Sequence, residues 1–154
     1  MSKVNRGKQF EKHFESDWKR SFPSTLILRL KDDTSGYYGN SRNPCDFICH
    51  PNSDVYMIET KAHYGNRFPF SDFPQYEILL SYQHCKYTKI GLVVWFMDFD
   101  KVLYFSLSTI TKMIHNGLKS INLKNLNHED YEYIEIPSVK KRVFMESDYS
   151  ILIV

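Results

Sequence analysis

The segment from Ile90 to Met97 is almost entirely apolar and far too short to span a membrane, so it predicts a buried strand at the centre of a sheet. Further runs of strand length, bounded by turn residues, occur at 25–30, 45–49, 55–61 and 101–105. Helical patterns lie between them at 5–21, 75–87 and 108–116. Strands interleaved with helices predict an α/β protein with a mixed central sheet flanked by helices.

The two ends of the chain carry different signals. At the N-terminus, Phe10, Phe14 and Trp18 recur at every fourth residue, which predicts one apolar helix stripe ended by Pro23. Toward the C-terminus, 131–136 and 149–154 have strand patterns, whereas 118–130 is polar. The 154 residues suffice for one core, so 1–154 is interpreted as a single domain.

Composition limits the class of protein. Hydrophobic residues make up 42% and charged residues 25%, which is typical of a folded globular chain. The formal net charge of +2 does not by itself indicate a nucleic-acid binder, although an acidic centre behind a basic rim would give such a sum. Three cysteines and a polar N-terminus argue against a disulfide framework and a signal peptide, so a cytoplasmic location is expected.

The motif Glu59-Thr60-Lys61 stands at the end of an apolar strand, and further acidic residues precede it in the sequence. Side chains alternate along a strand, so Glu59 and Lys61 share one face, and Asp46 on the preceding hairpin strand can lie opposite them. Glu11, at the edge of the first helix, is a further candidate. Carboxylate oxygens suit Mg²⁺ or Mn²⁺, and a nearby lysine can position a nucleophile or stabilise a transition state, which together favour phosphodiester hydrolysis.

Simpler interpretations of these residues stay open. Glu59 and Lys61 can form an ordinary surface ion pair, Asp46 can cap a turn, and Glu11 can be a solvated helix residue. A zinc site is a second alternative, with its candidate ligands at Cys45, Cys49, His50, His84 and Cys85.

The order of these motifs resembles the RecU-type Holliday junction resolvases, and especially their short, phage-borne members. The likeness begins with Asn5-Arg6-Gly7-Lys8-Gln9-Phe10-Glu11 and continues through Arg29-Leu30-Lys31-Asp32, Ser35-Gly36 and the run from Ser41 to Phe47. It then includes Glu59-Thr60-Lys61, Phe68-Pro69-Phe70-Ser71, Gln75-Tyr76, Leu79-Leu80, and Gly91 to Phe96 with Asp98 and Asp100. The resemblance covers roughly residues 4 to 115.

This resemblance implies a PD-(D/E)XK nuclease core and a homodimer that cuts four-way DNA junctions symmetrically with Mg²⁺, for which Mn²⁺ substitutes. By motif, Asp46 and Glu59 are metal ligands, Lys61 is the catalytic lysine and Glu11 supports the site. Gln75 is expected close to the metal or the scissile phosphate, and Gln83 is its rival for that role.

The sequence indicates the residues that would contact DNA less directly than it indicates the catalytic residues. Family members from bacteria carry a long stalk where this chain has only the short loop 31–43, so Tyr37, Tyr38 and Arg42 are candidates for contacting the junction. Arg6 and Lys8 are candidate phosphate contacts. The basic run at 140–142 is either a solvated surface or a further DNA contact. Two alternatives to a resolvase are a restriction-type or less selective endonuclease and a non-catalytic recombination-accessory protein.

Overall fold

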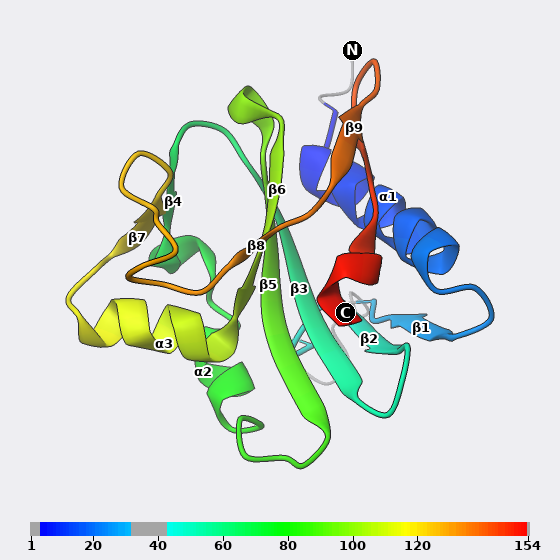
Figure 1. Cartoon of the computed structure of the whole chain (residues 1–154), viewed down its shortest axis with the longest axis horizontal. Coiled ribbons are helices and arrows are strands. Elements are labelled where there is room, and N and C mark those ends of the chain that lie inside the picture. The colour runs from blue at the N-terminus through cyan, green and yellow to red at the C-terminus, as the bar shows by residue number, and fades with distance from the viewer. Residues whose placement is uncertain (1–3, 32–42, 154) are drawn as a thin grey trace, which may run out of the picture.

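The computed structural model describes residues 4–31 and 43–153, which form a six-stranded mixed sheet with helices on both faces (Figure 1). The strand order is β1-β2-β3-β5-β6-β8. The bounds are β1 Leu26–Arg29, β2 Phe47–His50, β3 Val55–His63, β5 Thr88–Phe96, β6 Lys101–Ser106 and β8 Ile134–Glu135. The pair β3 and β5 is parallel and the other neighbours are antiparallel, so the predicted mixed α/β sheet is confirmed.

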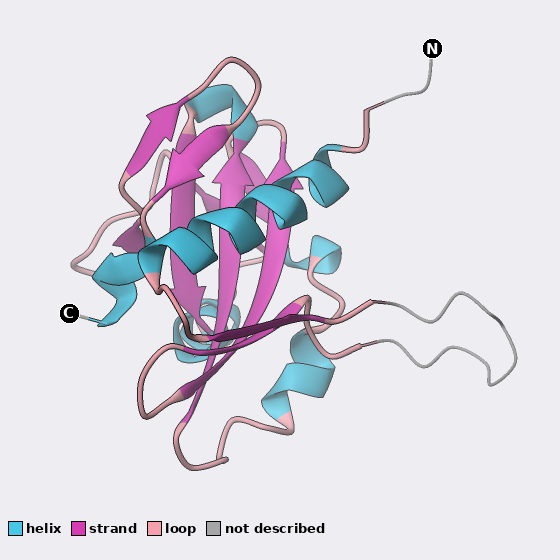
Figure 2. Ribbon diagram, turned by 90° about the vertical axis from the view of Figure 1, so that its right-hand side faces the viewer, coloured by secondary structure: helices cyan, strands magenta, loops and turns pink. Residues whose placement is uncertain are grey.

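Helix α1 (Arg6–Ser21) lies across one face of the sheet (Figure 2). Asn5 caps it by accepting a hydrogen bond from the Lys8 amide, which satisfies one of the free N–H groups of the first turn. The predicted stripe of Phe10, Phe14 and Trp18 is buried against the inner strands. Burial of aromatic side chains of this size stabilises the helix on the sheet by several kcal/mol in total, at about 25 cal/mol per Å² of apolar area.

The opposite face is covered by the segments that follow β3 and β6. The first comprises β4 (Arg67–Pro69), the 3₁₀ turn η1 (Phe70–Asp72) and α2 (Tyr76–Leu80); the second comprises α3 (Leu107–His115) and β7 (Ser120–Asn122). A further 3₁₀ turn, η2 (Met97–Phe99), joins β5 to β6. Leu79, Ile110 and Met113 pack there against the inner strands. Because β3 and β5 are parallel, the chain between them must return along the sheet, and it does so over this face.

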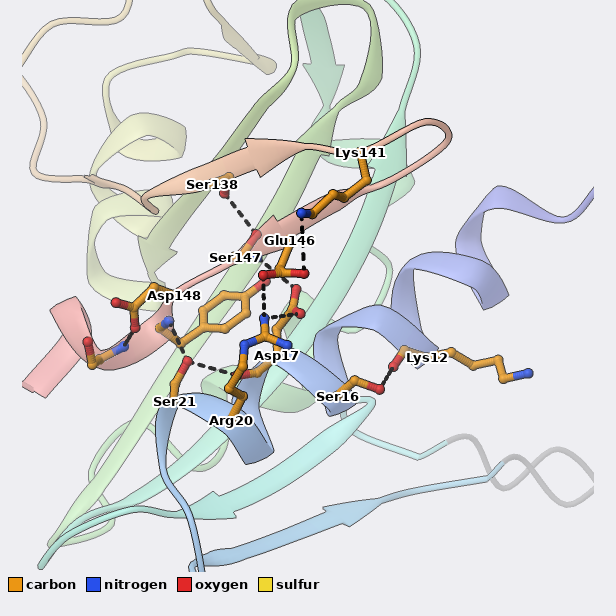
Figure 3. Close-up of polar contacts among 12 residues, drawn as sticks. Lys12, Ser16, Asp17, Arg20, Ser21, Ser138, Lys141, Glu146, Ser147 and Asp148 are labelled. Carbon is orange, nitrogen blue, oxygen red and sulfur yellow. Dashed lines mark hydrogen bonds and ion pairs between the residues drawn. The ribbon is translucent and has the colours of Figure 1, made fainter.

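The C-terminal segment packs against α1. It comprises the hairpin of β9 (Ser138–Lys140) and β10 (Met145–Ser147), followed by the 3₁₀ helix η3 (Tyr149–Ile153). The buried Asp17 carboxylate accepts a hydrogen bond from the Ser147 amide at 2.9 Å and pairs with Arg20 at 2.7 Å (Figure 3). Burial raises the pKa of Asp17, and these two partners oppose that rise.

Three predicted elements differ from the observed ones. The helix expected at 75–87 is α2 alone, because the residues after Leu80 are exposed and offer no apolar stripe for packing. The strand expected at 131–136 is reduced to 134–135, where β6 supplies the only pairing partner among the described residues. The strand expected at 149–154 was wrong, since residues 149–153 form η3, in which Tyr149 is buried beneath α1. Among the described residues, no helix has the length and apolar character to cross a membrane.

Candidate active site

Asp46 immediately precedes β2 and is held in place by backbone and side-chain bonds. Its amide donates to the Ile58 carbonyl at 3.1 Å, which continues the β2–β3 pairing and sets Asp46 opposite Glu59. Its Oδ2 accepts two hydrogen bonds, from the Thr60 amide at 2.9 Å and the Thr60 hydroxyl at 2.8 Å. One carboxylate oxygen is therefore fixed by protein, and the aspartate orientation is determined before any ligand arrives.

Thr60 is the residue that sequence reasoning missed. The motif gave Thr60 no role of its own, yet its hydroxyl donates to the Asp46 carboxylate. The available signal was the hydroxyl between the acid and the lysine, because a threonine beside a hairpin partner can bond to a carboxylate there.

Glu59 and Lys61 lie on one face of β3, as the alternation predicts. The Glu59 side chain is 3% exposed, and the Lys61 Nζ lies 3.3 Å from Glu59 Oε1. Burial, followed by the negative charge of Asp46, raises the pKa of Glu59 to about 8, and Lys61 only partly opposes this rise. The site thus holds two carboxyl groups that repel each other in a poorly solvated place, and an ammonium group pairs with one of them, Glu59.

This donor set fits a hard divalent cation. Two carboxyl groups supply oxygen ligands, and a positive ion between them would remove the repulsion that raises the pKa of Glu59. The zinc alternative has no such support. Within residues 4–31 and 43–153, no three His, Cys, Asp or Glu side chains gather as a metal site. Cys45 and Cys49 are buried and Cys85 is exposed.

Glu11 lies apart from this pair. Its carboxylate binds the Arg29 guanidinium at 2.6 Å, and α1 covers the face of the sheet opposite to the face that bears Met57 and Glu59. Among the described residues, no hydrogen bond or ion pair joins Glu11 to Asp46 or Glu59. Arg29 precedes Leu30, whose amide donates to the Asp46 carbonyl at 2.8 Å, so the Glu11–Arg29 pair braces the strand beside Asp46.

The two glutamine candidates differ in their surroundings. Gln75 begins α2, and its side-chain Oε1 is buried without a hydrogen-bond partner. A buried carbonyl oxygen without a partner is costly and is normally satisfied by a bound water, an ion or a ligand group. Gln83 is exposed and lines a surface hollow with Thr88 and Lys89. These surroundings favour Gln75.

The DNA-contact candidates are only partly described. Tyr37, Tyr38 and Arg42 lie outside the described residues. Lys8 is exposed on α1, whereas Arg6 is partly buried and donates to the Gln9 side chain at 2.7 Å. In the basic run, Lys140 pairs with Asp100 at 2.6 Å and Lys141 with Glu146 at 3.9 Å, while Arg142 is exposed.

Solved structures resemble the chain, and one of them covers 67% of its length. It is Hjc of Archaeoglobus fulgidus, described as a Holliday junction resolvase from an archaeal hyperthermophile. The match has a TM-score of 0.51 and 15% sequence identity, and it covers 67% of this chain and 78% of the other. Neither family models nor curated proteins match the sequence. At this identity the likeness establishes the fold, a restriction-endonuclease-like core, as predicted.

Proposed function

We propose that this protein is a metal-dependent endodeoxyribonuclease that resolves four-way DNA junctions. The observation that carries the proposal is the buried Glu59 carboxyl beside Asp46, with the Lys61 ammonium at 3.3 Å. A carboxyl pair of this kind opposes folding when both groups are ionised, which points to a functional role for its position. The Hjc-like fold supports nuclease chemistry at this sheet.

Asp46 and Glu59 are the proposed ligands of Mg²⁺, with Mn²⁺ as a substitute. The cation would neutralise charge on the phosphate and lower the pKa of a bound water. Thr60 holds Asp46 Oδ2, so that Oδ1 is the oxygen available to a ligand. Lys61, whose Nζ lies 3.3 Å from Glu59 Oε1, would stabilise the charge that develops on the phosphate oxygens.

The remaining site residues act around this centre. Gln75 would direct its buried Oε1 to the metal or to the attacking water, which satisfies that oxygen. Glu11 acts through Arg29 rather than on the substrate, by keeping the strand next to Asp46 in position. Lys8, Arg6 and Arg42 contact phosphates, and Tyr37 and Tyr38 face the junction.

The substrate and the assembly follow from the resemblances. The structural neighbour is described as a Holliday junction resolvase, and the motif order resembles the short, phage-borne RecU-type enzymes. Symmetric cutting of two opposed strands suits a C2 homodimer with one site per subunit. For a phage-encoded protein, the place of action is the cytoplasm of the host.

The decisive experiment is cleavage of a strand-labelled four-way junction in Mg²⁺, beside a linear duplex made from the same sequences. We expect paired symmetric nicks on the junction alone, and none with Glu59→Gln protein. Equal cutting of the duplex would replace the proposal with a restriction-type or less selective endonuclease. Tight junction binding without cutting in Mg²⁺ or Mn²⁺ would replace it with an accessory protein.

A further inference from the structure

The strand that carries Glu59 and Lys61 runs directly into a turn that presents an exposed aromatic ring. Tyr64 follows β3 and is 61% exposed. It lies three residues beyond Lys61, which corresponds to about 10 Å along an extended chain. Among the described residues, its ring makes no hydrogen bond or ring contact. A large ring left in water just beyond the strand that carries Glu59 and Lys61 is a candidate contact for a substrate.

The backbone on both sides of Tyr64 is fixed. The Gly65 amide donates to Asp98 Oδ2 at 2.6 Å, and Gly65 adopts a φ of +83°, which favours glycine. The His63 ring nitrogen Nε2 lies 2.6 Å from the Arg67 carbonyl, which can only accept, so Nε2 carries the proton.

His63 is itself held in place, since its ring meets Phe68 and Phe96 edge-on. Tyr64 is therefore displayed from a rigid base, and binding through its ring loses little backbone entropy.

The same turn carries a positive charge. Arg67 is exposed directly after it, whereas the Asp98 carboxylate is engaged by the Gly65 amide. A ring that is free to stack and a cation beside it form the combination that binds single-stranded or unpaired nucleotides. Peptides or lipids do not require this pairing of a flat ring with a guanidinium group.

We infer that Tyr64 stacks on an unpaired or opened base next to the branch point, and that this contact contributes to the choice of branched over linear DNA. The inference rests on the proposed function. In a linear duplex each base is covered on both faces by its neighbours. The Tyr64 ring could stack on such a base only after the duplex is unstacked, which costs free energy. At a branch point that stacking is interrupted, and a fixed ring at the end of the strand that carries Glu59 can contact the exposed face.

The test uses a junction with 2-aminopurine beside the branch point and full-length protein in which Glu59→Gln prevents cutting. In this background, Tyr64→Leu removes the ring while keeping a similar apolar volume, and Tyr64→Trp retains an aromatic face. The matched control is Tyr87→Leu, because Tyr87 is 73% exposed but lies just before β5, where its carbonyl accepts from Val55 at the opposite end of β3.

We expect Tyr64→Leu to weaken junction binding about ten- to hundredfold and to abolish the change in 2-aminopurine fluorescence, in line with the usual strength of base–aromatic stacking. Tyr64→Trp should restore both, Tyr87→Leu should change neither, and duplex binding should be unaffected throughout. Unchanged junction affinity and fluorescence in Tyr64→Leu would overturn the inference while leaving the proposed resolvase intact.

A second measurement does not depend on a Tyr64 variant. Photocrosslinking of 5-iododeoxyuridine placed at the branch point, with Glu59→Gln protein, should yield an adduct on Tyr64. Crosslinks that map only elsewhere would contradict the stacking contact. If the parent protein binds four-way and linear DNA equally, the proposed function itself fails, and the inference falls with it.

Discussion

Replacing Glu59 by glutamine should make the metal-free protein more stable, even though it should destroy the activity. The pKa of Glu59 is raised from 4.5 to about 8, first by burial and then by Asp46. Between these two values the native protein holds a proton that the unfolded chain releases. The contribution of Glu59 to stability is therefore fully present below about pH 4.5 and is lost as the pH rises through about 8.

The magnitude follows from the size of this shift. Each pKa unit corresponds to about 1.4 kcal/mol, so full ionisation of Glu59 opposes folding by on the order of 5 kcal/mol. Glutamine keeps the volume without the charge, but its amide N–H groups need partners and offset about 1–2 kcal/mol of the gain. We expect Glu59→Gln to be about 3–4 kcal/mol more stable than the parent at pH 8.5 and close to it at pH 5.

The assay is urea denaturation in EDTA at pH 5 and pH 8.5, for the parent, Glu59→Gln and the exposed control Glu77→Gln. The difference between the parent and Glu59→Gln isolates this one titration, because other shifted groups change equally in both proteins. Parallel stability curves for the two proteins across this pH range, or a Glu59→Gln protein that is less stable at pH 8.5, would refute the account of a strained carboxyl pair.

Further predictions concern the same site and the core around it. Mg²⁺ at ten times its dissociation constant should raise the stability of the parent by about 1.4 kcal/mol in a thermal-shift assay, and Asp46→Asn should abolish that rise. Lys61→Ala should lower the junction cutting rate at least about a hundredfold without changing the Mg²⁺-induced shift; a normal rate would make the lysine a mere ion-pair partner. Gly91→Ala should destabilise the fold by about 2–3 kcal/mol in urea denaturation, because the added methyl would overlap the Tyr104 ring. Asp17→Ala should leave the Ser147 amide unsatisfied, and hydrogen exchange should then show faster opening of the C-terminal hairpin, with a loss of about 2 kcal/mol.

Local patterns predicted the elements that build the site. Alternation along 55–61 correctly assigned Glu59 and Lys61 to one face, and the expected hairpin of 45–49 with 55–61 sets Asp46 opposite Glu59. The spacing of Phe10, Phe14 and Trp18 likewise predicted the buried stripe of α1. Each of these features depends on neighbours that are close in sequence.

Contacts between segments that are distant in the sequence could not be predicted from local patterns. The parallel pairing of β3 with β5 depends on where the intervening chain passes, and no residue in either strand encodes that choice. The approach of Glu11 to Arg29 instead of the acid pair depends on which face of the sheet α1 covers. Tyr149 forms η3 rather than a strand because its ring completes the packing beneath α1, a tertiary effect that outweighs local β-propensity.

The return path from β3 to β5 has a consequence for how such an enzyme can change. Asp46 lies directly before β2, and Glu59 and Lys61 lie on β3, so a shift of one residue in the β2–β3 pairing would change which side chains meet. The length of the segment from Tyr64 to Tyr87 is not fixed by strand pairing in this sheet, since the segment need only lead to the start of β5. New loops or a longer helix can be added there, away from Gln75, while the proposed cutting chemistry stays unchanged. We therefore expect proteins that share this chemistry to diverge in target choice mainly through the length and composition of this one segment.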